Sequence, residues 1–498
     1  MLTIGIGIGG CSAPTGPAGG GAEGGGGTLT IAAVIDNNSF DRAALEIGNR
    51  VHYWMPVYDT LLVLDPEAKV QPNLATEWSY NSDNTVHTLT LREDVEFTDG
   101  APFDAEAVKA NLEHLKNGTG QNSYMAASIE EVEIVDTHEV ALRLTAPDPG
   151  LLGYLAVVGG AMASPATLGA ADAASNPIGS GPYTLNAAES TPGTQYVYER
   201  NEDYWNEDEF PYDQLVIKPI SDNTARLNAL KSGQVDVGAI QATSIAEAEG
   251  SGLTVERYPT DWHGLFLADR AGAQVPALAD PRVRQAINYG IDTESILENM
   301  YLGEGEPTDQ PFNTESEAYV PELDEAYEYD LDKALDLMAE AGYEDGFAVT
   351  MPDLASWPQV APIIEQQLAE LNIDVTFQKV AADATISELL SGKYPMFFFN
   401  LGSQGAWQDF RKFGFANSPW NTAKVDDPEM TALLAEAQAA QGDEQIEALQ
   451  AANEYLVENA WFAPWYRANT LLAVSTEVDA TPQAWNVVPW IRNFAPAS

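Results

Sequence analysis

Basic residues and cysteine are both scarce in this sequence. Lys and Arg account for only 23 of the 498 residues, against 75 Asp and Glu, and the net charge is −52. A surface of that sign repels nucleic acid and anionic headgroups, so we expect no nucleic-acid partner. The single cysteine, Cys11, has no second cysteine to pair with, which excludes an internal disulfide and leaves no thiol nucleophile in the folded part of the chain.

Long apolar runs are missing as well. The longest uncharged apolar stretch beyond the N-terminus is LLGYLAVVGGAMA, from Leu151 to Ala163. It is shorter than the roughly 20 residues that a membrane-spanning helix needs, and it contains glycines. We therefore expect this stretch to be buried within the protein.

Catalytic motifs are also absent. No two of the five histidines stand at helical spacing around a glutamate, which excludes a zincin motif. No Gly-x-Ser-x-Gly elbow is present, and no phosphate-binding loop or Gly-x-Gly-x-x-Gly turn follows a strand. The nearest candidate, GSGPY at 179–183, is typical of a turn before a strand. These absences favour binding over catalysis, and we expect no enzymatic activity, no cofactor and no resident metal ion.

Residues 1–27 predict a targeting segment and not a folded part of the protein. Residues 1–8 look like the end of a signal-peptide apolar core, and the small residues before Cys11 loosely fit a lipobox. Residues 12–27 are rich in Gly, Pro and Ala and predict a flexible tether. A basic segment before the apolar core is missing, which a start of translation upstream of Met1 would explain. We expect lipidation of Cys11 and anchoring on the extracytoplasmic face of the cytoplasmic membrane; the alternative is a cysteine without function in a low-complexity leader.

Strand and helix patterns alternate along the remainder. The run TLTIAAV from Thr28 and the alternating segment 131–144 predict strands, the latter as two strands around a polar turn. Asp280, followed by proline, predicts a helix cap. The apolar spacing of 360–371 predicts another helix, followed directly by a strand at 373–380. A helix followed by a strand in this way is typical of an α/β layer arrangement.

Aromatic residues are plentiful, with 11 Trp, 20 Tyr and 16 Phe. Most of them must belong to the core. Aromatic side chains with a polar edge also supply the contact area that ligand clefts require. Three clusters in polar surroundings are therefore candidates for a ligand site: Tyr53-Trp54, Trp262-His263 and Trp407-Gln408-Asp409.

Several separated motifs resemble one known family. The segment Val57–Leu115, which contains VYDTLLVLDPEAKVQPNLATEW and FTDGAPFDAEAVKANLEHL, closely resembles the extracellular solute-binding proteins of family 5, which bind dipeptides, oligopeptides or nickel for ABC importers. NPIGSGPYTL from Asn176, ARLNALKSGQVDV from Ala225 and LADPRVRQAINYGID from Leu278 resemble further motifs of that family, in the same order. The resemblance covers nearly the whole chain beyond Thr28.

The resemblance implies an α/β fold with two lobes, the type II (cluster C) periplasmic-binding-protein fold, with an extra α+β domain on the N-terminal lobe. It implies that lobe I comprises residues 28–57, 176–277 and 475–498, that the extra domain comprises 58–175, and that lobe II comprises 278–474. Strands that cross between the lobes would form a hinge, and the lobes would close on a solute as rigid bodies.

The resemblance also directs attention to the segment 397–413, FFFNLGSQGAWQDFRKF. Peptide-binding members carry a Gly-Trp-x-x-Asp pattern in lobe II, whose aspartate pairs with the amino terminus of the ligand. Aligned from Gly402, the tryptophan becomes Ser403 and the aspartate becomes Ala406, whereas an insertion that matches Trp407 leaves Asp409 one place early. Neither alignment restores the pattern, which also admits an uncharged or differently charged solute. The adjacent Arg411 and Lys412 could meet an anionic group or be ordinary surface charges.

The sequence therefore predicts a membrane-tethered substrate-binding protein of an ABC importer. We expect a monomer that captures a peptide or other small organic solute, delivers it to the permease and ATPase subunits, and catalyses no reaction. The alternatives are a sensory solute receptor of the same fold, a secreted hydrolase, and uptake of a nickel chelate. The residues predicted to contact the ligand are Tyr53, Trp54, Trp262, His263, Ser403, Gln404, Trp407 and Asp409.

Overall fold

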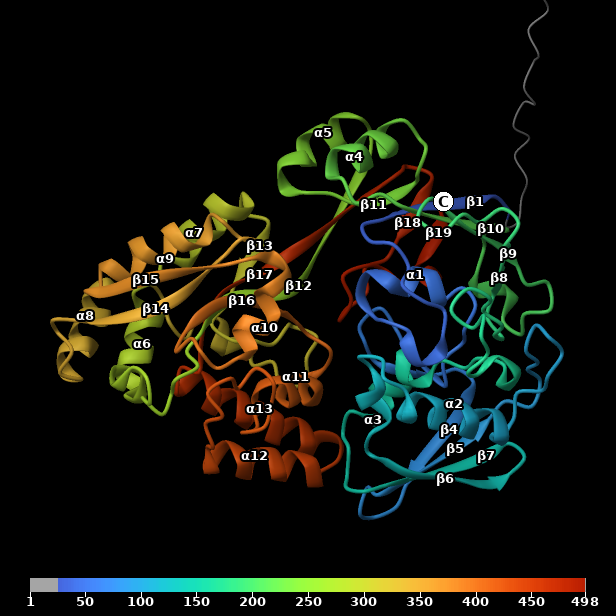
Figure 1. Ribbon diagram of the computed structural model, residues 1–498, viewed down its shortest axis with the longest axis horizontal. Helices are drawn as coiled ribbons and strands as arrows, with labels where there is room; N and C mark the ends of the chain where they lie inside the picture. Colours follow the sequence, from blue (N-terminus) through green and yellow to red (C-terminus); the bar gives the residue numbers. More distant parts are fainter. Residues whose placement is uncertain (1–25, 498) are drawn as a thin grey trace, which may run out of the picture.

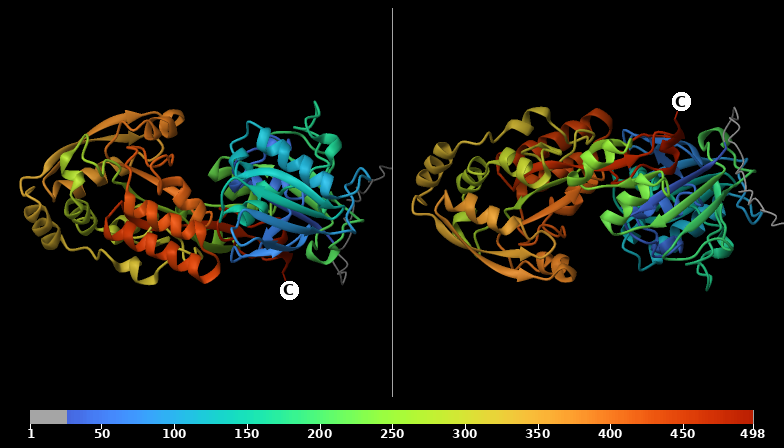
Figure 2. Two further views of the ribbon diagram at one scale, coloured as in Figure 1. Left: turned by 90° about the horizontal axis from the view of Figure 1, so that it is seen from below. Right: turned by 90° about the horizontal axis from the view of Figure 1, so that it is seen from above.

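The computed structural model of the protein describes residues 26–497 and consists of two lobes joined by two long strands (Figure 1). The first lobe is built from the N-terminal half of the chain and its last residues, and the second from most of the remainder. Figure 2 shows the same two lobes from below and from above. Cys11, the signal-like segment and nearly all of the predicted tether lie outside the described residues.

A nine-stranded sheet runs through both lobes in the order β16-β12-β17-β11-β1-β10-β9-β8, with β13 added to β17. The strand predicted at Thr28 is β1, which is largely buried and pairs in parallel with β10 and β11. The strands of this sheet are β1 (Thr28–Ala33), β8 (Tyr183–Leu185), β9 (Tyr196–Arg200), β10 (Gln214–Pro219), β11 (Val237–Ala239), β12 (Thr254–Phe266), β13 (Gly305–Pro307), β16 (Phe397–Gly402) and β17 (Phe462–Val474).

The two longest strands, β12 and β17, cross between the lobes (Figure 1). They pair antiparallel along their whole length, from Thr254 opposite Val474 to Phe266 opposite Phe462. At one end β17 also pairs with β11, and at the other end β12 pairs with β16 and β17 with β13. Between these ends, 257–259 and 469–471 pair with each other, and within the described residues no third strand flanks them. A register shift after Pro259 interrupts the ladder there, as a β-bulge does.

A separate four-stranded sheet in the first lobe has the order β4-β5-β7-β6. The two strands predicted within 131–144 are β6 and β7, and their pairing confirms the expected hairpin. The elements outside the large sheet in this lobe are α1 (Val51–Trp54), β2 (Leu62–Leu64), β3 (Val70–Pro72), β4 (Ala75–Tyr80), β5 (Val86–Leu91), α2 (Ala105–Asn117), β6 (Ile129–Asp136), β7 (Glu139–Leu144), α3 (Leu151–Leu155), α4 (Asn223–Lys231), α5 (Ile245–Gly250), β18 (Val478–Ala480) and β19 (Phe494–Pro496).

The second lobe contains both predicted helices, the one capped by Asp280 and the one within 360–371. The carboxylate of Asp280 accepts a hydrogen bond from the Arg282 N–H, which confirms the cap of α6. Strands β14 and β15 are parallel and α9 connects them, so the predicted helix–strand order belongs to a β-α-β unit. The elements of this lobe are α6 (Pro281–Tyr289), α7 (Thr293–Tyr301), α8 (Leu331–Glu340), β14 (Phe347–Leu354), α9 (Val360–Ala369), β15 (Ile373–Val380), α10 (Thr385–Leu390), α11 (Ala406–Phe413), α12 (Pro428–Ala439) and α13 (Gly442–Glu458).

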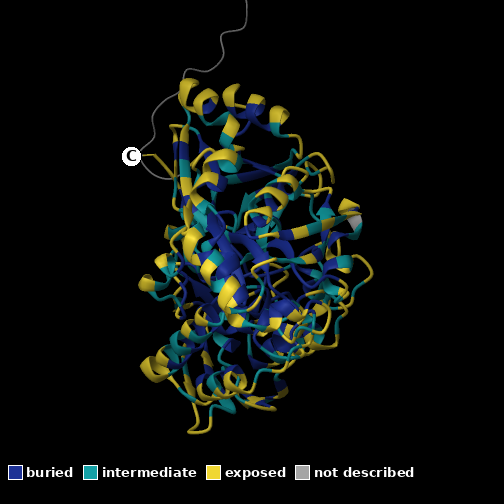
Figure 3. Ribbon diagram, turned by 90° about the vertical axis from the view of Figure 1, so that its left-hand side faces the viewer, coloured by how far each residue is buried: buried dark blue, intermediate teal, exposed yellow. Residues whose placement is uncertain are grey.

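Each lobe has its own buried core. Figure 3 shows buried residues gathered along the strands, with exposed residues on the outer faces of the helices. The apolar stretch 151–163 forms α3 and the turns after it and packs within the core of the first lobe, as predicted. No helix among residues 26–497 combines the length and the apolarity that crossing a membrane requires.

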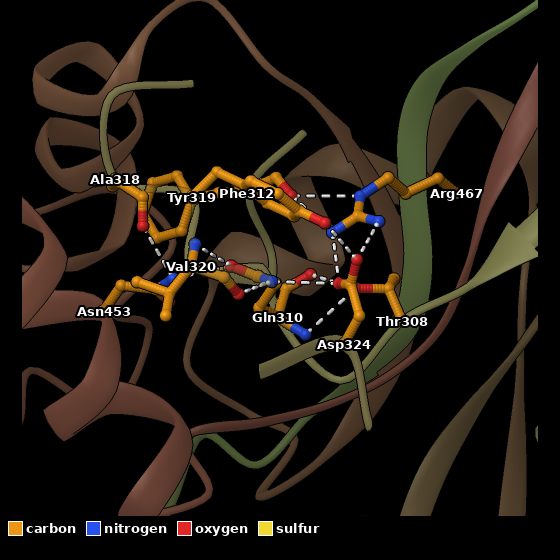
Figure 4. A network of polar contacts seen from close by, with 9 residues as sticks. All are labelled: Thr308, Gln310, Phe312, Ala318, Tyr319, Val320, Asp324, Asn453 and Arg467. Carbon is orange, nitrogen blue, oxygen red and sulfur yellow. Dashed lines mark hydrogen bonds and ion pairs between the residues drawn. The ribbon is translucent and has the colours of Figure 1, made fainter. Parts of the chain in front are cut away.

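A buried ion pair fastens β17 to the second lobe (Figure 4). The guanidinium of Arg467 donates to both carboxylate oxygens of Asp324, at 2.6 and 3.1 Å, and also to the carbonyl oxygen of Phe312. The Asp324 carboxylate accepts further hydrogen bonds from Thr308 and Tyr319, at 2.7 Å each. Since Arg467 is 1% exposed, this network holds the 308–324 segment against the crossing strand.

Candidate functional site

A cavity of about 590 Å³ lies between the lobes and is lined from both of them. Its first-lobe wall comes from 124–128 and from the loop 145–148 that runs on to Tyr154 in α3, and its second-lobe wall comes mainly from α11. The lining residues are Tyr124, Ala127, Ser128, Thr145, Ala146, Pro147, Asp148, Tyr154, Gln404, Trp407, Gln408, Arg411, Lys412, Pro419 and Gln438. A volume of this size suits a small organic molecule.

A smaller apolar pocket of about 40 Å³ adjoins this cavity and shares Tyr154, Gln404 and Gln408 with it. The remaining walls include Met125 from the first lobe and Trp485 from the segment that follows β18. Aromatic and aliphatic walls with a few amide groups are the usual composition of a small-molecule site. The two spaces together give the interlobe site an apolar recess beside a polar chamber.

Helix α11 positions the second-lobe wall. It begins after Gly405, whose φ of +105° lies in a region that favours glycine. The carboxylate of Glu317 accepts a hydrogen bond from the Ala406 N–H at 3.1 Å and so satisfies one of the free N–H groups of the first turn. One face of the helix, with Phe410 and Phe413, is buried in the core of the second lobe. The opposite face, which carries Gln408 and Arg411, is left to line the cavity.

Asp409 lies behind the cavity wall and is 2% exposed. One carboxylate oxygen accepts from the Ser403 hydroxyl at 2.6 Å, and the other accepts from the Lys412 ammonium at 2.7 Å and from the Gln404 N–H at 3.2 Å. Burial raises the pKa of Asp409, and the Lys412 ammonium opposes that rise. Lys412 donates in addition to the carbonyl oxygen of Gly402, at 2.7 Å. Both charges are therefore paired within the protein.

The two lobes touch each other around the cavity. A Cβ atom on Gly150 would lie 3.2 Å from the Trp407 ring, and one on Gly405 would lie 3.1 Å from the Trp485 ring. At the rim, the Gln438 side chain of α12 donates to the carbonyl oxygen of Pro147 at 2.7 Å. These contacts join α11 and α12 directly to the first lobe, so the cavity lies between two lobes that touch each other.

The structure brings four of the predicted ligand residues together at this site. Gln404 and Trp407 line the cavity, and Ser403 and Asp409 lie directly behind them. Trp407 is 4% exposed and packs edge-on against Phe415 at 5.9 Å. Gln404 thus presents its side chain to both spaces, whereas Ser403 and Asp409 can act on a ligand only through the residues in front of them.

The predicted residues of α1 lie in the core of the first lobe. The Tyr53 hydroxyl donates to the carbonyl oxygen of Ile35 at 2.8 Å, and its ring packs edge-on against Tyr196. The Trp54 indole N–H donates to the carbonyl oxygen of Glu46 at 2.7 Å. Both side chains have no more than 1% exposure, and neither lines the interlobe cavity. Their contact with a ligand stays a prediction.

The predicted residues of β12 lie in the second lobe at the crossing strands. Trp262 stacks on Phe266 with ring centroids 5.1 Å apart. His263 is 5% exposed and lies between the rings of Tyr301 and Tyr466, and burial lowers its pKa to about 4. No group of three His, Cys, Asp or Glu side chains suited to a metal ion occurs among residues 26–497. A ligand role for Trp262 and His263 also stays a prediction.

Sequence reasoning missed the first-lobe wall, of which Asp148 and Tyr154 are the main polar members. The Pro-Asp-Pro-Gly turn at 147–150 was a usable signal, since such a turn marks an exposed loop. The alignment from Gly405 was also overlooked: it places Asp409 at the aspartate position of the pattern, with Ala406 at the tryptophan position.

Known proteins resemble this chain in sequence. Residues 69–423 match the model of the bacterial extracellular solute-binding proteins, family 5 (middle). The glutathione-binding protein GsiB of Salmonella paratyphi A is 29% identical over 352 residues, which are 67% of this chain and 65% of that protein. GsiB of Escherichia coli K12 is 29% identical over 351 residues, 66% of this chain and 64% of that one. The matched part thus spans about two thirds of the length of these relatives.

Solved structures share the fold over almost the whole chain. HbpA2 from Haemophilus parasuis has a TM-score of 0.83 at 22% identity and covers 95% of this chain and 100% of its own. DppA from Helicobacter pylori in complex with the peptide STSA has a TM-score of 0.77 at 22% identity, with 95% and 99% coverage. NikA from Brucella suis in complex with Fe(III)-EDTA has a TM-score of 0.80 at 23% identity, with 94% and 100% coverage.

These likenesses confirm the bilobed α/β fold of type II that the sequence predicted. The family model also covers well over half of the chain, from the residue before β3 to the segment that follows α11. This protein therefore belongs to the bacterial extracellular solute-binding proteins of family 5.

Proposed function

We propose that the protein is the substrate-binding protein of an ABC importer, which captures a peptide or another small organic solute between its lobes and delivers it to the permease. The cavity of about 590 Å³, lined from both lobes, is the observation that carries this proposal. A solute in that position contacts both lobes at once, so its binding free energy favours the arrangement in which they touch.

Closure would use the crossing strands as the hinge. The resemblance implies a division into lobe I (28–57, 176–277 and 475–498), an extra domain (58–175) and lobe II (278–474). We propose this division with its boundaries in the crossing strands moved to 257–259 and 469–471, because residues 262–277 pack in the cores of the second lobe and 472–474 pair with β11 of the first. The pairing of 257–259 with 469–471, without a third strand, supports a pivot there, because few backbone contacts oppose bending at that point. A rigid-body motion about this pivot would bring α11 towards the first-lobe wall on closure and move it away on opening.

The ligands named for the relatives suggest the size of the solute. GsiB binds glutathione, DppA was solved with the peptide STSA, and NikA with Fe(III)-EDTA. All three are small, polar and rich in oxygen atoms. A cavity with aromatic walls, amide side chains and a few charges suits a solute of that kind.

The place of action would be the extracytoplasmic face of the membrane. We propose that Cys11 carries the lipid and that residues 12–27 tether the folded lobes, as the lipobox-like sequence suggests. The partners would be the permease and ATPase subunits of the importer, and the receptor would act as a monomer. Mass spectrometry of the membrane-bound protein tests the lipid directly, since an acylated Cys11 shifts the mass of the N-terminal peptide.

A thermal-shift screen of the purified protein tests the receptor function. The solutes would be glutathione, di- and oligopeptides, opines, oligosaccharides, and nickel with and without chelators, each at low and at molar salt. A solute that binds only the folded state at 100 times its dissociation constant adds about 2.7 kcal/mol to stability. We expect one chemical class to raise the melting temperature, by an amount that grows with the logarithm of its concentration above the dissociation constant. A well-folded protein that no class stabilises would argue against the receptor function.

A further inference from the structure

The charged residues that line the interlobe cavity are mostly basic, although the chain as a whole is strongly acidic. The whole sequence has 75 acidic and 23 basic residues, yet two of the three charged residues that line the cavity are basic. They are Arg411 and Lys412 on α11, and they face Asp148 of the first lobe. Basic residues thus outnumber acidic ones among the side chains that line the cavity, and this favours a solute of negative charge.

Most of the carboxylates near the cavity already accept hydrogen bonds from other groups of the protein. Asp409 accepts hydrogen bonds through both of its oxygens, and one of its donors is the Lys412 ammonium, 2.7 Å away. Glu317 accepts from the first N–H of α11. Asp148 uses one oxygen to accept from the Gly150 N–H at 3.1 Å. Lys412 thus fills the position where an ammonium group of a ligand would otherwise meet a buried carboxylate.

Arg411 differs from Lys412 because it forms no ion pair within residues 26–497. Its side chain is exposed and lines the cavity. The guanidinium carbon lies over the Phe415 ring, 5.5 Å from the ring centroid. The guanidinium group presents several N–H donors in one plane, which matches a carboxylate in a bidentate arrangement.

A second donor stands on the opposite wall. No hydrogen bond to the Tyr154 hydroxyl is found within the described chain, although the side chain is only 5% exposed. Burial raises the pKa of Tyr154 well above its usual value, the charges of Asp148 and Tyr124 raise it further, and the positive charge of Arg411 opposes the rise. The hydroxyl therefore stays protonated and is available to donate to an acceptor that Arg411 also binds.

The net charge of −52 does not prevent an anion from binding here. At physiological ionic strength the field of distant surface charges is screened over about 8 Å. Inside the cavity the nearest charges decide, and among residues 26–497 two of its charged lining residues form no ion pair, Arg411 and Asp148, of which only Arg411 attracts an anion. The overall charge lowers the rate at which an anion arrives, whereas the local guanidinium determines how tightly it is held.

We propose that the interlobe cavity selects a solute that carries a carboxylate and that Arg411 binds that carboxylate, with Lys412 withholding Asp409 from amino groups. This inference rests on the proposed receptor function and narrows its substrate class. The specificity of the site then lies in the α11 pair Arg411 and Lys412, and the ligand amino group is not the anchor.

Matched ligands that differ only in their carboxylates test the proposal. Isothermal titration would compare glutathione with its diethyl ester, dialanine with dialanine amide, and the tightest acid from the thermal-shift screen with its own ester. The proteins would be the wild type, Arg411→Gln, Arg411→Lys, and Arg282→Gln as a control for loss of an exposed arginine at the far end of the second lobe. Melting curves without ligand would establish that all four proteins fold equally well.

We expect the free acid to bind about tenfold tighter than its ester, as loss of one charge-assisted pair implies. Arg411→Gln should lose this preference, Arg411→Lys should keep part of it, and Arg282→Gln should keep all of it. Equal affinity for acid and ester, an unchanged preference in Arg411→Gln, or tight binding of neutral or cationic solutes only would overturn the carboxylate proposal and leave the receptor function in place. If no solute of the screen bound the wild type, both proposals would fail.

Discussion

Replacing Asp324 by asparagine tests how strongly the crossing strand β17 is fastened to the second lobe. The substitution removes the negative charge and leaves the Arg467 guanidinium buried, with the new amide oxygen and the carbonyl oxygen of Phe312 as neutral acceptors (Figure 4). Five hydrogen bonds reach the carboxylate, two of them from Arg467. The damage should therefore be far larger than that of an ordinary surface substitution.

The magnitude follows from the burial of the pair. Removal of one partner from a buried ion pair costs about 3–5 kcal/mol, because the other charge stays in a poorly solvated place. The side chain of Asp324 is 20% exposed and that of Arg467 is 1% exposed, so water can partly reach the site, and we expect a loss of about 3 kcal/mol at the lower end of that range. Replacing Tyr319 by phenylalanine removes one neutral donor and should cost about 1 kcal/mol.

Native-state hydrogen exchange of the β17 amides is the suitable assay, since it reports local opening free energies in a protein whose two lobes need not unfold together. Asp332→Asn on the exposed face of α8 is the matched control for loss of one negative charge. A loss in Asp324→Asn no larger than that in Tyr319→Phe, or one equalled by Asp332→Asn, would refute the reasoning.

The pH dependence gives a second check. Burial would raise the pKa of Asp324, but the hydrogen bonds and charge of Arg467 outweigh it and the pKa lies below its usual value. The contribution of this group to stability is thus present above the unfolded pKa near 3.9 and is lost as the pH falls through the lower folded value. The difference between the wild type and Asp324→Asn should shrink below about pH 4 and be constant from pH 6 to pH 8. A difference that grew on acidification would contradict this assignment.

Three further predictions concern the site and its surroundings. Gly405→Ala should weaken binding of any interlobe solute about tenfold or more, because its φ of +105° disfavours a side chain and the new Cβ meets Trp485 at 3.1 Å; Gly252→Ala, where φ is +89° and nothing lies within 4 Å, should lower stability without changing affinity in the same titration. Burial raises the pKa of Asp59 to about 6, so its contribution to stability is complete below the unfolded value near 3.8 and is lost as the pH rises through 6. Relative to Asp59→Asn, the wild type should therefore lose about 3 kcal/mol between pH 4 and pH 7 in urea titrations, and parallel curves would disprove the shift. Lys412→Met should destabilise the second lobe by about 3 kcal/mol, because it leaves the buried carboxylate beside it without its cation, and an unchanged melting temperature would contradict this.

Much of the fold could be predicted from the sequence because the signals are local. The cap at Asp280, the hairpin within 131–144 and the helix–strand unit at 360–380 each depend on residues a few positions apart. Hydrogen bonds of a helix cap and the alternation of a strand are made by neighbours in the chain, so the pattern of side chains carries them. The resemblance to one family joined these local elements into two lobes.

The candidate site was predicted only in part, and the reason is geometric. Tyr53, Trp262 and Trp407 are all aromatic residues in polar stretches of sequence and all belong to buried cores, yet only Trp407 also lines the cavity. Whether such a ring meets a ligand or a neighbouring side chain depends on which strands and helices pack over it. No short stretch of sequence contains that information.

The family, the acidity and the absence of cysteine from the folded part can be read directly from the order of the amino acids, as can most of the helix and strand pattern. The tertiary structure alone decided which charges are free. Asp409 is paired with Lys412 and Ser403. Arg411 has no counterion among residues 26–497, and it lines the same cavity as Tyr154, which comes from a segment more than 200 residues earlier in the chain. Because electrostatic interactions act between groups that are close in space, only the folded chain shows which ones are already satisfied.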